Sequence, residues 1–408
     1  MTINVRKVAE DEFNDWCDAT DVGFMSPERR GEGPRRRARY DIDRCWGGFD
    51  GDLVVGGLRG LDLWMTVPGG TAVRTDGITS VTVATTHRRR GLLSRMMAAE
   101  LAAAVERGEA LSALVAAEWP IYGRFGFGAA AEGCGWHFDA RGAAFVRDLP
   151  GRVETVDLAT ARAEAPLLYD RVMARTPGAV SRGSWYWDRD LNTVPAEGER
   201  VPRDQMFAFC RDERGETVGY AHYKFADKWT QARPDGAVEI LDLFAVDVEY
   251  EARMWKFLAD HDWVSTVYVR EHRRIDELWR DLLVDRRAVW SVDRWDSIWI
   301  RVLDPVAALG ARRYEVAGRI VMRITDKDGY ADGTFVLEGG PDGAACAPTA
   351  EPPEVTLSAS VLGSIYLGGF SAARFGRLGL IEEHAPGAVG RLAALFHTAV
   401  APWAATSF

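Results

Sequence analysis

Residues 88–91 read Arg-Arg-Arg-Gly and lie between two apolar segments. Alternation predicts a strand over 77–83, and apolar steps of three and four predict a helix from Leu92 onward. The first N–H groups of a helix are unpaired and lie at its positive dipole end, where anions bind. Arginine binds phosphate oxygens in pairs, and Gly91 has no Cβ to obstruct the approach. We therefore predict a pyrophosphate-binding turn; the alternative is a solvated charge run, although arginine has the wrong sign for a helix N-terminus.

The elements that must position this turn recur further along the chain. After the predicted helix, a short apolar strand is expected over 111–118. About 160 residues later the same order returns, with strands over 238–247 and 264–270 that flank a helix over 249–262. We interpret this repeat as an internal duplication.

The second turn differs from the first in charge. Asp247, Glu249 and Glu251 stand where the arginines would be, and no glycine opens the helix. Acidic side chains suit a helix N-terminus but repel phosphate. We therefore predict one cofactor site per chain.

The remaining patterns complete a three-part division, 1–147, 148–296 and 297–408. Residues 52–67 are expected to form two strands joined at Gly60, and 121–128 a loop or bulged turn that leads into a strand. In the third part, Asp304 and Pro305 predict the N-cap and first residue of a short helix. A hairpin, a Pro-rich loop over 344–353 and a helical end from Leu362 follow.

Composition narrows the function classes. The net charge of −10 argues against nucleic acid as a partner, and it either favours cationic substrates or serves solubility alone. Five isolated cysteines suggest free thiols in a reducing compartment, and no HExxH or Cys/His cluster predicts a metal site. With no signal-like start and no long apolar run, we expect a cytoplasmic protein that does not enter the membrane.

Several stretches together resemble a known family. The strand and turn "VTVATTHRRRGL" resemble motif A of the GNAT N-acetyltransferases, which binds the pantetheine arm and pyrophosphate of acetyl-CoA. "IYGRFGFG", "VSRGSWYWDRDL", "DSIWIRVLDPVAALGARRY", "LGSIYLGGFSA" and the ending "ATSF" resemble the enhanced intracellular survival (Eis) family. This resemblance covers essentially the whole chain.

The resemblance implies an α/β (α+β) fold of three parts. These are a catalytic GNAT domain (1–147), a degenerate GNAT domain (148–296) and a sterol-carrier-like domain (297–408). It further implies a homohexamer that acetylates amines of aminoglycosides, and possibly lysine side chains, with acetyl-CoA as cosubstrate. The alternative is an acetyl-CoA- or lipid-binding carrier without turnover.

Acetyl transfer to an amine needs a proton acceptor for the ammonium and a proton donor for the departing thiolate. By resemblance Tyr122 is the general acid, and the terminal carboxylate of Phe408 is the general base. The alternatives are that Tyr122 only packs beside Phe125 and Phe127, and that the chain end is a disordered tail.

The remaining site residues follow from the same motifs. Cofactor-binding candidates are Val81, Thr82, Val83, Arg88, Arg89, Arg90, Gly91 and Leu92. Substrate-binding candidates are Asp21, Phe24, Glu118 and Ser407. The chain departs from the family at Thr85, where proline is frequent, and at Ser407, where a glutamate can line the substrate site.

Overall fold

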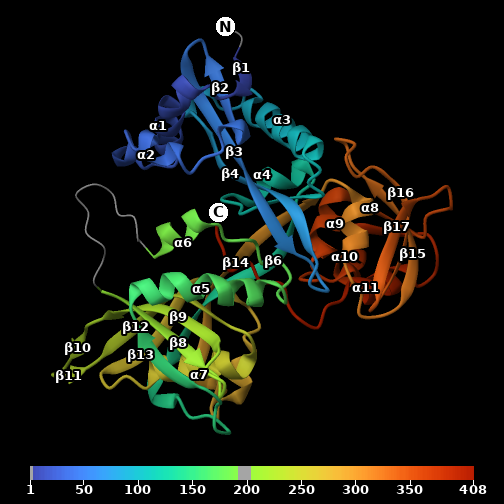
Figure 1. Ribbon diagram of the computed structural model, residues 1–408. Coiled ribbons are helices and arrows are strands. Elements are labelled where there is room, and N and C mark those ends of the chain that lie inside the picture. Colours follow the sequence, from blue (N-terminus) through green and yellow to red (C-terminus); the bar gives the residue numbers. More distant parts are fainter. Residues whose placement is uncertain (1–2, 192–203) are drawn as a thin grey trace. The chain divides into compact units, whose positions relative to one another are not determined.

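The computed structural model describes residues 3–191 and 204–408. The chain forms two compact units, one of Met1–Ala130, Ile298–Ala399 and Phe408, the other of Ala131–Ser297 and Val400–Ser407. Figure 1 shows the course of the chain. Strands β6 (Gly128–Asp139) and β14 (Val289–Val302) each carry the chain from one unit to the other. The boundaries near 147 and 296 stay predictions. None of the described helices is long and apolar enough to cross a membrane.

The first unit begins with a twisted sheet in the order β1-β2-β3-β4-β5-β14. Its other strands are β1 (Asn4–Lys7), β2 (Cys45–Asp50), β3 (Leu53–Thr66), β4 (Ala72–Val83) and β5 (Leu111–Leu114). Strands β1 to β4 pair antiparallel, whereas β4 and β5 pair in parallel. The helices are α1 (Phe13–Gly23), α2 (Gly33–Arg37), α3 (Leu92–Glu106) and α4 (Trp119–Tyr122).

Two neighbouring glycines of β3 explain how helices cover both faces of this sheet. A Cβ on Gly56 would meet Met96 of α3, and a Cβ on Gly57 would meet Trp16 and Thr20 of α1. Because successive strand residues point to opposite faces, α3 and α1 lie on opposite sides of β3, as Figure 1 also shows. Because Gly56 and Gly57 have no side chains, both helices can lie close to β3.

The expected turn at Gly60 is wrong, because β3 runs unbroken through it and Gly60 pairs with Ile78 in the ladder. The glycine is needed for packing instead. A Cβ there would lie 2.1 Å from Oε1 of Glu100 and 2.7 Å from Oδ1 of Asp76, two fully buried carboxylates. A glycine inside an apolar run therefore marked a close approach and not a turn.

The second part of this unit is a five-stranded sheet in the order β17-β16-β15-β18-β19, with helices packed against it. Its strands are β15 (Gly318–Thr325), β16 (Gly333–Gly340), β17 (Gly343–Pro348), β18 (Val355–Ser358) and β19 (Ile381–Glu383). Its helices are α8 (Pro305–Ala311), α9 (Ala359–Tyr366), α10 (Ala372–Arg377) and α11 (Ala388–Phe396).

Helix α8 starts as expected, because Asp304 accepts a hydrogen bond from the backbone N–H of Ala307 and Pro305 is the first helical residue. The predicted Pro-rich loop is wrong in its first half. Residues 343–348 form β17, which pairs with β16. Strand β19 also interrupts the helical end.

The second unit repeats the first arrangement, with strands in the order β6-β13-β12-β9-β8-β7. These are β7 (Arg152–Val156), β8 (Gln205–Arg211), β9 (Thr217–Ala226), β12 (Gly236–Ala245) and β13 (Val264–Arg274). A small hairpin pairs β10 (Trp229–Thr230) with β11 (Arg233–Pro234). The helices are α5 (Leu158–Met173), α6 (Ser184–Asp190) and α7 (Val248–Ala259). Strands β12 and β13 pair in parallel around α7, as β4 and β5 do around α3, so the expected strand–helix–strand repeat is present.

Candidate active site

The arginine turn forms an open helix N-terminus. Arg89 (φ 62°) and Gly91 (φ 74°) both lie in the left-handed region. Gly91 is the N-cap of α3, without a capping side chain, and no acidic residue stands in the first turn. Arg88, Arg89 and Arg90 are exposed, and none forms an ion pair or hydrogen bond within the described chain. The site therefore offers unpaired backbone N–H groups and three free guanidinium groups to an anion.

Strand β4 has an irregularity just before this turn. Its pairing with β3 passes from Arg59↔Thr79 to Gly57↔Thr82, so Ser80 and Val81 together oppose Leu58. Ser80 takes a positive φ of 57°, as a bulged residue can. Pairing with β5 ends at Ile78↔Leu114. Within the described residues, the end of β4, residues 80–83, therefore has no strand partner on the β5 side.

The predicted cofactor residues lie together at this edge and turn. Val81, Thr82 and Val83 are half-buried at the end of β4. The Leu92 side chain is buried in the core with Ile3 and Val55. Leu92 can therefore contact a ligand only through its backbone.

Tyr122 is the last residue of α4 and is 6% exposed. Its ring meets the ring of Phe127 edge to face, with centroids 6.3 Å apart. Burial, and to a smaller extent the nearby charge of Glu118, raises the pKa of the phenol above its ordinary value of 10.0. Its hydroxyl has no hydrogen-bond partner among residues 3–191 and 204–408. Tyr122 is thus a protonated phenol at neutral pH with its donor unused.

Residues 119–125 are helical, α4 followed by a 3₁₀ turn, where a loop or bulged turn was expected; only Gly126 (φ 79°) is left-handed. Pro120 in the first turn of α4 is typical of a helix start. The glycines that follow at 123, 126 and 128 favoured the loop interpretation instead. Strand β6 then follows, as expected.

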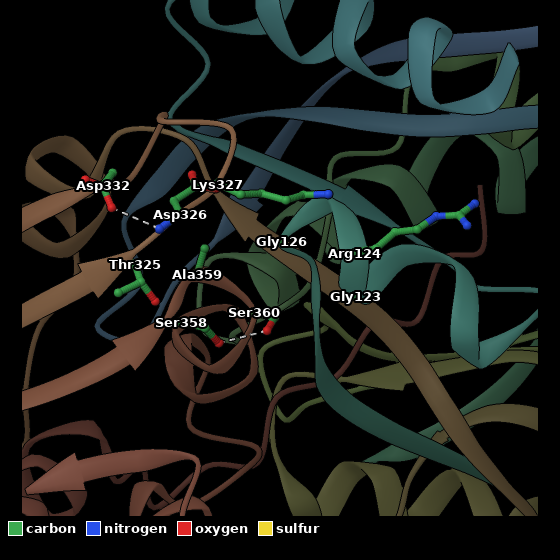
Figure 2. Close-up of a pocket in the computed structure, with 10 residues that line it drawn as sticks. All are labelled: Gly123, Arg124, Gly126, Thr325, Asp326, Lys327, Asp332, Ser358, Ala359 and Ser360. Atoms are coloured by element: carbon green, nitrogen blue, oxygen red, sulfur yellow. Dashed lines mark hydrogen bonds between the residues drawn. The ribbon is translucent and has the colours of Figure 1, made fainter. Parts of the chain in front are cut away.

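A cavity of about 620 Å³ lies beside this turn (Figure 2). Gly123, Arg124 and Gly126 line it from the turn, and its other lining residues include Asp326, Lys327 and Ser358. In Figure 2, the Lys327 side chain extends toward the turn.

A buried ion pair supports Gly126. The Arg301 guanidinium donates to both oxygens of Asp326 at 3.0 Å, and both side chains are almost fully buried. A Cβ on Gly126 would lie 1.4 Å from a terminal nitrogen of Arg301. The Arg301–Asp326 pair therefore lies against the turn that carries Tyr122. Because the two residues are 25 positions apart in the chain, no local sequence pattern indicates the pair.

The predicted substrate-binding residues differ in how far they are exposed. Helix α1 ends against β4, because a Cβ on Gly23 would overlap the Thr82 side chain. Phe24, next in the chain, is 51% exposed, but Asp21 is buried and bonded to Arg36 at 2.9 Å. Glu118 is exposed at the N-cap of α4. The Asp21 carboxylate is therefore already neutralised by a guanidinium group, which weakens its case as a cation ligand.

The chain end is ordered. Residues 402–406 are buried, and Ser407 and Phe408 are half-buried. Val400–Ser407 pack with the second unit, whereas Phe408 is grouped with the first, the unit that contains Tyr122. The alternative of a disordered tail does not hold for residues 402–406.

The second copy of the turn is closed by its own side chains. The Asp247 carboxylate accepts hydrogen bonds from the backbone N–H groups of Glu249 (3.1 Å) and Tyr250 (3.2 Å) at the start of α7. Glu251 is buried beneath it and pairs with Arg273 and Arg274. A carboxylate therefore occupies the place that an anionic ligand would need.

Family comparisons agree with this architecture. Residues 4–130 and 178–302 each match an acetyltransferase (GNAT) domain, and 305–405 match a sterol carrier protein domain. An N-acetyltransferase Eis of Mycobacterium tuberculosis is 34% identical over 80% of this chain and 79% of its own. The chain belongs to the Eis family of GNAT N-acetyltransferases. An uncharacterized N-acetyltransferase of Streptomyces avermitilis is 37% identical over 100% of this chain and 99% of its own.

Solved structures agree with the fold. Eis1 of Mycobacterium abscessus has a TM-score of 0.87 at 26% identity, with both chains fully covered. A GNAT protein of Anabaena variabilis has a TM-score of 0.85 at 18% identity, again over both whole chains, and this likeness concerns the fold alone. The predicted fold, two GNAT domains followed by a sterol-carrier-like domain, is confirmed. The protein is an acetyl-CoA-dependent N-acetyltransferase, whereas the roles of individual site residues stay predictions.

Proposed function

We propose that this enzyme acetylates amines of small, multiply charged substrates such as aminoglycosides, and also lysine side chains. The observation that carries the proposal is the uncapped N-terminus of α3, where Arg88, Arg89 and Arg90 find no partner in the described chain. Such a helix end favours the pyrophosphate of acetyl-CoA. The unpaired edge of β4 beside it suits the amide groups of the pantetheine arm, which can pair with backbone as a strand does.

In this proposal the cofactor residues divide by the part of acetyl-CoA that they bind. The backbone of Val81, Thr82 and Val83 faces the pantetheine arm. The guanidinium groups at 88–90 and the N–H groups of Gly91 and Leu92 hold the pyrophosphate. The positive charge is local, since the whole chain carries −10, so the turn concentrates anion binding at one place.

Proton transfer is assigned to two residues. Substrate amines with a pKa near ~10 are mostly protonated at neutral pH and must lose a proton before they attack the thioester carbon. The Phe408 carboxylate, with a terminal pKa near ~3.5, is ionised and accepts that proton directly or through a water molecule. Tyr122, whose pKa burial raises, stays protonated and gives its proton to the departing thiolate.

The substrate side of the proposal rests on charge and aromatic surface. Exposed Phe24 and Glu118 offer a ring face and a carboxylate to a polyamine. Asp21 contributes only if Arg36 releases it, and Ser407 stands where a glutamate can occur in the family. We therefore expect an amine profile different from that of relatives with glutamate there. The homohexamer and the cytoplasmic location stay predictions.

The test is thiol release from acetyl-CoA with kanamycin and with lysine-type amines, and mass spectrometry of the products. Steady release with acetylated amine supports the enzyme, and a C-terminal tag should abolish it while an N-terminal tag does not. Binding of acetyl-CoA without release for any amine tested would favour a carrier. A fully active C-terminally tagged enzyme would remove Phe408 from the mechanism and leave the acetyltransferase assignment standing.

A further inference from the structure

Arg182 is a buried cation of the second unit, inside the "VSRGSWYWDRDL" stretch, for which the mechanism so far gives no role. Its side chain is fully buried. Its Nε donates to the Thr406 hydroxyl at 2.8 Å, and one terminal nitrogen donates to the Ala405 carbonyl at 3.1 Å. The other terminal nitrogen donates to the Asp242 carboxylate at 2.5 Å. Two of its three bonded groups therefore belong to the chain end.

The surroundings fix this guanidinium in one orientation. Four rings face it at 4.1 to 5.8 Å from its central carbon, those of Tyr169, Tyr186, Trp187 and Phe244. A buried cation is costly unless it is paired and hydrogen-bonded, and here Asp242 compensates the charge while Thr406 and Ala405 accept hydrogen bonds from two further donors. The planar guanidinium suits three acceptors at once, which a lysine ammonium on a flexible stem does less well.

The tail depends on side chains because it has no strand partner. Residues 400–408 form no regular secondary structure, and one backbone–backbone hydrogen bond within the described chain joins them to the rest, from Trp403 N–H to the Pro177 carbonyl at 2.8 Å. The Trp403 indole donates to the His272 carbonyl at 2.6 Å, and the Tyr169 hydroxyl lies 3.1 Å from that of Thr406. Near the end, Ala405 and Thr406 are held chiefly by Arg182.

We propose that Arg182 is a positioning residue for acetyl transfer, because it fixes the Ala405–Thr406 segment and so the place of the terminal carboxylate. This inference rests on the proposed function of Phe408. Two residues span at most about 7 Å, so a fixed Thr406 confines the Phe408 carboxylate to a small volume. A freed tail would spread the carboxylate over many positions, and proton transfer would become less frequent.

The variant Arg182→Met tests the role, since it keeps length and apolar contact with the rings but removes every donor. We expect kcat to fall at least ~10-fold, with acetyl-CoA affinity within about twofold of wild type. The matched control is Arg211→Met, because Arg211 bonds Glu154, Glu164 and Thr217 in the same unit and makes no contact with the tail. Arg182→Lys should restore part of kcat by keeping the charge beside Asp242.

The tail itself gives the second measurement. In Arg182→Met, hydrogen exchange at residues 404–408 and carboxypeptidase removal of Phe408 should accelerate at least ~10-fold, and not in Arg211→Met. If the Met variant fails to fold, Thr406→Val removes the acceptor from the other side and should show a smaller change of the same kind. Unchanged tail exchange, or a kcat loss equal to that of Arg211→Met, would overturn the proposal.

Deletion of Phe408 separates the two ideas. If the shortened enzyme is inactive while Arg182→Met keeps full kcat and a protected tail, the positioning role fails and the base stands. If the shortened enzyme keeps full activity, the base fails, and with it the catalytic purpose assigned to Arg182, even where exchange shows that Arg182 anchors the tail.

Discussion

Asp247 and Gly91 are the N-cap residues of equivalent helices in two copies of one strand–helix–strand unit, but only Asp247 caps its helix with a side chain. Asp247 fills the start of α7 with its own carboxylate, whereas Gly91 leaves the start of α3 uncapped between β4 and β5. The parallel strand pairs around the two helices match in order, so the difference lies in the side chains of the turn and not in the backbone plan. The N-terminus of α3 can therefore bind an external anion, whereas the N-terminus of α7 is already occupied by the Asp247 carboxylate.

The first prediction concerns stoichiometry and follows from this difference. Calorimetry should give one acetyl-CoA per chain, and Gly91→Asp should weaken binding at least ~10-fold, because it adds a carboxylate and forces a side chain into a left-handed backbone. Gly215→Asp is the control. It places the same side chain at a left-handed position (φ 80°) of the second unit, where no atom lies within 4 Å of the added Cβ. Two equivalent sites in the wild type would contradict the prediction.

The second prediction concerns backbone strain at Arg89. A non-glycine residue at φ 62° costs roughly 1–3 kcal/mol, and asparagine tolerates this region better. Arg89→Asn should therefore raise the free energy of unfolding by roughly 1 kcal/mol while acetyl-CoA binds several-fold more weakly. Arg90→Asn, where φ is not positive, should weaken binding without the stability gain. Acetyl-pantetheine lacks the pyrophosphate, so the rate of acetyl transfer from it should be the same in both variants as in the wild type. Equal losses of activity with acetyl-CoA and with acetyl-pantetheine would refute a pyrophosphate contact.

Local signals predicted part of this molecule, and long-range packing decided the rest. The start of α8 at Asp304 and Pro305, the duplication and the charge reversal between the two turns all depend on neighbours in sequence. The glycine at position 60 of β3 is explained by the close approach of Glu100, and strand β17 is explained by its pairing with β16. The Arg182–Thr406 bond joins residues 224 positions apart. No window of the sequence contains such a pair, so its partner could not be named from the motif.

The third prediction concerns Tyr122 as general acid. Tyr122→Phe should lower kcat at least ~10²-fold and keep acetyl-CoA affinity, because the ring still packs on Phe127 while the proton donor is gone. The raised pKa sets the sign of the pH profile, because the acid works in its protonated form and is lost only as pH rises through a value above 10. The wild-type kcat should therefore show no fall due to this group near neutral pH. A Phe variant with wild-type turnover would exclude the role.

The fourth prediction compares two glycines three residues apart. Gly126→Ala places a Cβ against the Arg301 guanidinium at a φ of 79°, and it should destabilise the protein by roughly 2–5 kcal/mol and lower kcat by shifting Tyr122. Gly123→Ala is the matched control, because no atom lies within 4 Å of its Cβ and its backbone is helical. It should be neutral or stabilise by up to ~1 kcal/mol. Thermal unfolding of the two variants decides, and equal melting temperatures would contradict the account of the turn.

The fifth prediction concerns Glu251, whose pKa is raised from 4.5 to about 7 by burial and then by the charge of Glu277, against the opposing effect of Arg273 and Arg274. A carboxyl with a raised pKa in the folded protein stabilises it fully below pH 4.5 and loses that contribution as pH rises through about 7. Glu251→Gln cannot ionise, so its unfolding free energy minus that of wild type should increase between pH 4.5 and 7.5. Denaturant unfolding across this range measures the difference. A difference that stays flat across this range would mean that the Glu251 carboxyl stays ionised in the fold.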